Sequence, residues 1–134
     1  MSAIWGMISK QNVIADSVTD RMKNGMKMFK IDDYQEVVHG GVYFACGKQY
    51  ITEEDYADDL PLYDEKRQIL FTADCVLSNR NNLITELSEV YSGEELQAAG
   101  DGQLSYKAYL HWGETFVEHL RGSFSFAVYR MEEK

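Results

Sequence analysis

The sequence has few cysteines and no long apolar run. Its two cysteines, Cys46 and Cys75, lie far apart in apolar segments, so a disulfide framework is not expected. Together with His39, His111 and His119 they show none of the spacings of a metal site, and we expect buried thiols and no metal. No segment reaches the length of a membrane span or has the pattern of a secretion signal. These absences favour a cytoplasmic protein.

Basic residues are also scarce. The 13 lysines and arginines stand against 22 acidic residues, which gives a formal net charge of −9. Such a surface repels nucleic-acid phosphates and anionic lipids, so we expect neither nucleic acid nor a membrane as partner. The 134 residues suffice for one domain with a core, and a hydrophobic share of 45% is ordinary for a globular protein.

The first half of the chain predicts a strand, a helix and a hairpin. The stretch "SAIWGMIS" behind Met1 is typical of a strand that is buried on both faces, although chain ends usually fray. We therefore expect the terminus to lie inside the structure. Apolar residues at helical spacing predict a helix over 16–29, capped by Asp16 or Ser17. The glycines at 40–41 predict the turn of a β-hairpin.

The second half predicts alternating elements. The acidic segment 53–67 is typical of a solvated loop, and residues 69–73 of a strand. A helix is expected from Asn79 to a stop at 92–93, followed by two further helices, the first of them opened by Asp101.

The last expected element is a strand over 124–129. This strand has no later partner in the sequence, so we expect either an exposed edge or a piece of a longer chain. An exposed edge predicts self-association by strand pairing, and therefore a homo-oligomer.

Three stretches together resemble a known family. They are "SAIWG" behind Met1, "LPLYDEKRQILFTADCVLSNRNNLITEL" and "GDGQLSYKAYLHWGETFVEHLRGSFSFAVY", and they resemble blocks of class II glutamine amidotransferase domains, with asparagine synthetase as the closest branch. The resemblance implies an α+β fold of the N-terminal-nucleophile hydrolase type, a four-layer αββα sandwich. It also implies that residues 1–134 form one C-terminally truncated domain, without a cofactor, of a longer protein with an ATP-using synthetase domain.

The resemblance further implies glutamine hydrolysis to glutamate and ammonia, but the matching residues are altered. Ser2 stands where the family has its cysteine nucleophile. Lys48 stands where the family has an arginine that binds the substrate carboxylate, and lysine lacks the planar, two-pronged guanidinium group of arginine. Asp74 and Cys75 stand at the oxyanion-hole positions of asparagine and glycine, so that the hole is degenerate. Loss of one such donor costs on the order of 2.7–4 kcal/mol, and a carboxylate adds negative charge where negative charge develops.

Asp101 matches the family aspartate that holds the substrate α-ammonium, and a role as helix cap is equally open. Our leading hypothesis is a catalytically inactive glutaminase-like domain, a pseudoenzyme that serves as structural and docking module for an ATP-dependent amide-forming domain. One alternative is an active amidohydrolase or glutaminase with Ser2 as nucleophile, which releases ammonia. Another is an unrelated small α+β binding module, which one sheet with helices on a single face would favour.

Overall fold

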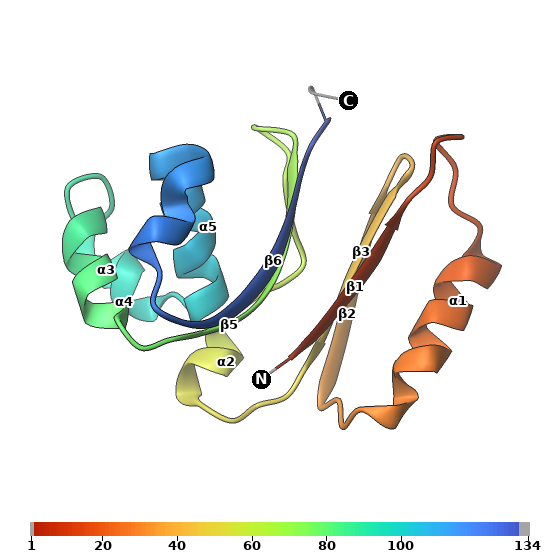
Figure 1. Ribbon diagram of the computed structural model, residues 1–134, viewed down its shortest axis with the longest axis horizontal. Coiled ribbons are helices and arrows are strands. Elements are labelled where there is room, and N and C mark those ends of the chain that lie inside the picture. The colour runs from red at the N-terminus through yellow and green to blue at the C-terminus, as the bar shows by residue number, and fades with distance from the viewer. Residues whose placement is uncertain (1, 132–134) are drawn as a thin grey trace.

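The computed structural model describes residues 2–131 and has four layers. Two antiparallel sheets of three strands each lie face to face between helices (Figure 1). Helix α1 (Asp16–Gly25) covers the outer side of the first sheet. The outer side of the second is covered by α3 (Arg80–Leu87), α4 (Gly93–Ala98) and α5 (Asp101–Trp112). The layers therefore follow the order expected from the resemblance, and the described residues do not form the one-sided arrangement of the alternative binding module.

The first sheet has the strand order β1-β3-β2. Its strands are β1 (Ala3–Ile8), β2 (Asp33–His39) and β3 (Val42–Lys48). The expected hairpin is confirmed, since β2 and β3 pair antiparallel around a turn in which Gly40 has a φ of +59°. Such a positive φ suits glycine, which has no Cβ. The central strand β3 is buried along its whole length.

The predicted helix over 16–29 is real but shorter at its end. α1 stops at Gly25, and a turn of 3₁₀-helix, Met26–Met28, follows. The expected cap at Asp16 or Ser17 is wrong, because the extended residue before the helix is Ala15, which has no side-chain acceptor.

The second sheet has the strand order β4-β5-β6. Its strands are β4 (Leu62–Asp64), β5 (Ile69–Leu77) and β6 (Gly122–Arg130), and β6 lies at the edge as expected. The prediction of a loop over 53–67 is wrong in part. This segment holds helix α2 (Glu53–Ala57), stabilised by a capping box of Thr52 and Asp55, and it also holds β4.

The helices of the second half pack on the second sheet and enclose the main core. They are α3 (Arg80–Leu87), α4 (Gly93–Ala98), α5 (Asp101–Trp112) and a 3₁₀-helix (Gly113–His119). The predicted helix end at 92–93 is wrong, because Ser92 is the N-cap of α4 and its Oγ accepts the Glu95 amide at 3.1 Å. None of the helices within residues 2–131 is both long and apolar enough to cross a bilayer.

The two sheets meet through a smaller apolar cluster. Val42 and Phe44 of β3 pack there with Leu70 of β5. On the side of β2 and β4, the His39 ring stacks on the Tyr63 ring with centroids 4.3 Å apart. This stack joins β2 of the first sheet to β4 of the second.

Candidate functional site

The beginning of the chain is tied to the second sheet. The backbone nitrogen of Ser2 donates a hydrogen bond to Asp74 Oδ1 of β5 at 2.8 Å. Ser2 leads into β1, which belongs to the other sheet, so this bond crosses from one sheet to the other. The expected strand is present as β1, but the expectation that it is buried on both faces is wrong, because none of its residues is fully buried and Ile8 is 57% exposed. Ser2 itself is half-buried. Met1, whose removal decides whether Ser2 carries a free amine, lies outside the described residues.

A small cavity lies beside this bond. Its lining includes three of the residues singled out in the sequence, namely Ser2, Lys48 and Cys75. The other lining residues are Cys46, Asp55, Asp58, Leu60 and Ala73. The volume of about 10 Å³ is room for about one water molecule. An amino acid can therefore enter only if the lining side chains move.

Lys48 brings a buried positive charge to this cavity. It ends β3 and is only 5% exposed. Within residues 2–131, none of the ion pairs involves Lys48. Its charge is nevertheless felt by its neighbours, because it lowers the pKa of Asp58 and of Cys46 against the larger raising effect of burial. A buried ammonium of this kind acts as a point charge, without the two-pronged geometry that an arginine gives to a carboxylate.

Asp58 is a residue of the site that the sequence analysis missed. Its two carboxylate oxygens accept the backbone N–H groups of Gly102 and Gln103, each at 3.0 Å, in the first turn of α5. Burial raises the pKa of Asp58 to about 6, the two hydrogen bonds lower it, and Asp101 raises it. A Cβ on Gly100 would lie 2.1 Å from Asp58 Oδ1, so the glycine permits this approach. Asp58 therefore caps α5 from outside the helix.

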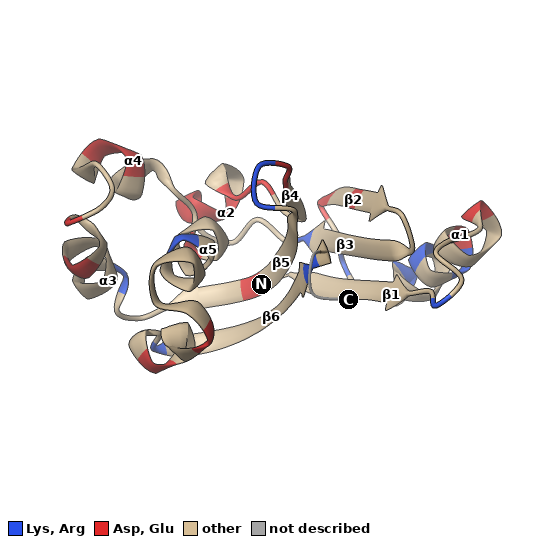
Figure 2. Cartoon of the chain, turned by 90° about the horizontal axis from the view of Figure 1, so that it is seen from above, with Lys and Arg blue, Asp and Glu red and all other residues tan. Residues whose placement is uncertain are grey.

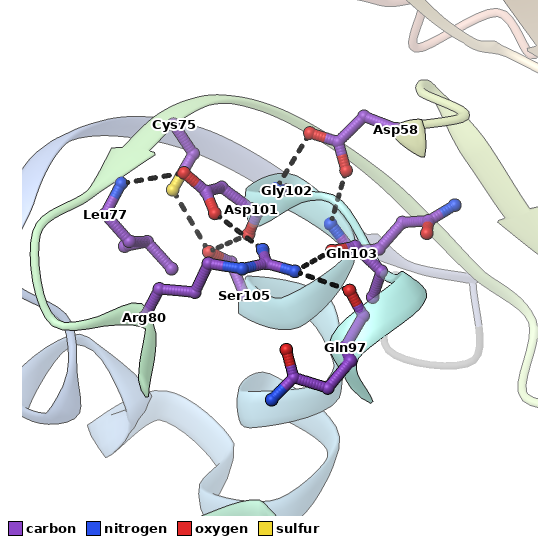
Figure 3. Close-up of polar contacts among 10 residues, drawn as sticks. Asp58, Cys75, Leu77, Arg80, Gln97, Asp101, Gly102, Gln103 and Ser105 are labelled. Atoms are coloured by element: carbon purple, nitrogen blue, oxygen red, sulfur yellow. Dashed lines mark hydrogen bonds and ion pairs between the residues drawn. The ribbon is translucent and has the colours of Figure 1, made fainter. Parts of the chain in front are cut away.

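Asp101 is not among the residues that line the cavity, and it is held by other partners. Its Oδ2 accepts the amide of Leu77 at 3.0 Å, and its Oδ1 pairs with Arg80 at 2.8 Å (Figure 3). The same guanidinium also donates to the carbonyls of Gln97 and Ala99. The expectation that Asp101 caps α5 is wrong, because the N-cap is Gly100. Both carboxylate oxygens instead join α5 to α3 and to the end of β5.

The two cysteines do not offer a substitute nucleophile. Cys75 Sγ lies 3.2 Å from Ser105 Oγ, which donates in turn to the carbonyl of Asp101 at 3.0 Å. Burial raises the pKa of Cys75 to about 12 and that of Cys46 to about 11. Since the thiolate is the reactive form of cysteine, both side chains are inert near neutral pH.

The structure thus brings together Ser2, Lys48, Asp74 and Cys75 and leaves Asp101 outside. A carboxylate within hydrogen-bond distance favours the ammonium form of an amine, so a free amine on Ser2 would be a poor base. Residues 2–131 contain no group of three or more metal-ligating side chains placed to hold an ion. The gathered residues form a closed, charged cavity rather than an open substrate pocket.

Comparison with protein families gives a match. A family model described as a glutamine amidotransferase domain matches residues 48–134, which is more than half of the chain. The matched range begins at Lys48 and contains Asp74, Cys75 and Asp101, whereas Ser2 precedes it. A search of curated proteins gave no match.

Proposed function

The chain belongs to the class II glutamine amidotransferase domain family, and from this premise we propose that it is a domain of the asparagine synthetase kind that has lost glutamine hydrolysis. One observation carries this proposal. Asp74 Oδ1 accepts the Ser2 backbone N–H at 2.8 Å, so the residue that the resemblance assigns to the oxyanion hole is in contact with the residue that it assigns to the nucleophile. Hydrolysis of an amide builds up negative charge there, and the Asp74 carboxylate opposes it.

The proton transfer needed for hydrolysis is impaired by the same contact. A serine hydroxyl is a weak nucleophile and needs a base, which in this family type is the amine of the same residue. If Met1 is retained, the nitrogen of Ser2 is a peptide nitrogen and cannot act as base. If Met1 is removed, the amine lies against Asp74 and the ammonium form is favoured. Either state leaves the hydroxyl without activation.

Substrate binding is weakened as well. Lys48 supplies charge to the cavity but not the bidentate geometry that orients a carboxylate. Both oxygens of Asp101, the residue that matches the ammonium-binding aspartate, are engaged by Leu77 and Arg80. A cavity of about 10 Å³ leaves no room for glutamine among these side chains.

The function that remains is that of a scaffold. We propose that the domain serves as structural and docking module for an ATP-dependent amide-forming domain and has no cofactor of its own. The contacts of α5 support this proposal, because the bonds that hold this helix in place come from Asp58 and Asp101, which are not among the altered residues.

A glutaminase assay on the full chain tests the loss of hydrolysis. Wild type is expected to release no more ammonia from glutamine than the Ser2→Ala variant. The Ser2→Cys, Asp74→Asn, Cys75→Gly triple variant restores the family residues and is the matched comparison. Ammonia release by wild type that Ser2→Ala abolishes would refute the proposal and favour the active amidohydrolase. An intact-mass measurement complements this assay. If Met1 is retained, the Ser2 nitrogen is in a peptide bond, and Ser2 cannot act as an N-terminal nucleophile.

A further inference from the structure

A pocket of about 260 Å³ lies on the outer side of the first sheet, where α1 ends. It is lined by Trp5, Lys23, Lys27, Phe29, Ile31 and Tyr34. The side chains of a strand alternate between its two faces, and Trp5 and Tyr34 lie opposite odd-numbered residues of β3. The even-numbered residues Cys46 and Lys48 of that strand line the cavity described above. The pocket is therefore on the opposite face of the sheet from the candidate site.

Two aromatic rings form one wall of this pocket. Trp5 of β1 and Tyr34 of β2 approach one another across β3, with ring centroids 5.7 Å apart and 17° between the ring planes. Gly47 lies opposite Tyr34, and Ile31 occupies the space beside it, since a Cβ on Gly47 would lie 2.6 Å from Ile31 Cδ1. The polar edges of both rings are engaged by Tyr43, whose hydroxyl accepts Trp5 Nε1–H at 3.2 Å and lies 3.1 Å from the Tyr34 hydroxyl. The rings are thus held in place, and flat ring surfaces of this kind stack on a flat ligand.

The same pocket carries positive charge. Lys23 Nζ lies 3.9 Å from the centroid of the Tyr34 ring, and Lys27 also lines the pocket. Within residues 2–131, neither lysine takes part in an ion pair. The chain has a net charge of −9, yet the segment 21–30, "RMKNGMKMFK", contains four basic residues and no acidic one, and Figure 2 shows basic residues gathered beside α1. Two ammonium groups without carboxylate partners favour an anionic ligand.

The aromatic wall stays neutral, so it does not repel an anion. Burial raises the pKa of the Tyr34 hydroxyl, and its hydrogen bonds to Glu36 and Tyr43 raise it further. The phenol is therefore uncharged near neutral pH. Glu36 accepts the hydrogen bond of the Tyr34 hydroxyl and is not among the residues that line the pocket.

The lining predicts the chemistry of a ligand. Pockets for drug-sized molecules measure about 300–1,000 Å³, so a pocket of about 260 Å³ suits one ring system with one acidic group. We propose that this pocket binds a small planar aromatic anion, whose acidic group is a carboxylate or a phosphate. The ring of the ligand lies against Trp5 and against Phe29, which is 49% exposed without it. The acidic group pairs with Lys23 and Lys27, because a lysine ammonium is a point charge that pairs with the oxygens of either group.

Isothermal titration calorimetry of the full chain with matched probes tests this proposal. Naphthoate and naphthyl phosphate, which join a flat ring to a carboxylate or to a phosphate, are expected to bind, and the tighter of the two identifies the acidic group. Naphthylmethylamine has the same ring with a positive charge, and its dissociation constant should be about tenfold or more above that of the tighter acid. Acetate and inorganic phosphate lack the ring, and their dissociation constants should also be about tenfold or more higher.

A double variant removes the charges of the pocket. Lys23→Gln together with Lys27→Gln changes two exposed side chains, so the fold should persist. The dissociation constant of the tighter acid should rise about tenfold or more. Lys66→Gln, at an exposed lysine in the turn between β4 and β5, is the matched control and should bind this acid like wild type.

The indole N–H signals of the two tryptophans locate the ligand by NMR. The Trp5 signal should shift on titration with the tighter acid, whereas the signal of Trp112, at the end of α5, should stay in place. Equal affinity for naphthylmethylamine, or an undiminished affinity of the double lysine variant, overturns the proposal. A shift confined to Trp112, or no saturable binding of either acid, also overturns it.

Discussion

Replacement of Asp58 by asparagine tests the electrostatics of the cavity. The Asp58 carboxylate lies between the first turn of α5, whose Gly102 and Gln103 amides it accepts, and the cavity shared with Lys48. Burial raises its pKa from 3.8 to about 6. Asp58→Asn has nearly the same shape as the protonated carboxyl group but cannot ionise. The variant therefore fixes the site in the neutral form at every pH.

The sign of the effect follows from proton linkage. Between pH 3.8 and about 6, the folded state keeps a proton on Asp58 that the unfolded state has released. The free energy of unfolding contributed by this group therefore falls as the pH rises through this window. The difference between a pKa of 3.8 and one of about 6 corresponds to about 3 kcal/mol. The free energy of unfolding of Asp58→Asn, measured relative to that of wild type, should therefore rise by up to about 3 kcal/mol between about pH 4 and about pH 7.

Urea unfolding of wild type and variant across this pH range measures the gain. Asp55 and Asp64 have a lowered pKa, so their contributions change below pH 3.8 and cancel in the comparison of the two proteins. Asp20→Asn, at an exposed carboxylate on α1, is the matched control for the change in net charge. If the difference between wild type and Asp58→Asn is also constant, the carboxylate is not buried as described and the reasoning fails.

Three further outcomes are expected. Gly102→Ala should lower stability by about 1–3 kcal/mol in urea unfolding, because its Cβ would lie 2.4 Å from a leucine methyl, whereas Gly93→Ala has open space and should be neutral or stabilising by up to about 1 kcal/mol. Lys48→Met should raise the melting temperature in calorimetry, since it removes a buried charge without an ion pair. Cys46 and Cys75 should react with a thiol reagent at pH 8 only after unfolding, because burial raises the pKa of both.

The elements that the sequence predicted well are those with a strong local signal. The hairpin at Gly40 and the alternating strand β6 depend on turn chemistry and on period-two alternation, which neighbouring residues supply. Strand β4 has three residues and exists because β5 pairs with it. Its composition looks like that of a loop. The local sequence around β4 gives no sign of its pairing with β5, so this strand could not be predicted from it.

The residues of the candidate site also differ in whether the sequence could predict them. Ser2, Lys48 and Cys75 could be singled out because the family resemblance marks their positions, and the structure gathers them at one cavity. The family resemblance does not single out Asp58, and in the acidic segment 53–67 it resembles the other carboxylates expected to face solvent. The signal that could have found it is the pair of glycines around Asp101, because Gly100 and Gly102 leave the space that Asp58 needs at the start of α5.

The charges around the cavity fit the scaffold role that we propose better than they fit glutamine hydrolysis. The carboxylates of Asp74 and Asp58 both add to the raising effect of burial on the pKa of the Cys46 thiol. Lys48 acts in the opposite direction on the same thiol and on Asp58. The cavity thus holds both signs of charge in a space too small for substrate, and the N–H of Ser2, which lines it, is bonded to the neighbouring Asp74 carboxylate. An oxyanion site needs donors without a competing acceptor, whereas a tie between two sheets needs an acceptor, and Asp74 meets only the second need.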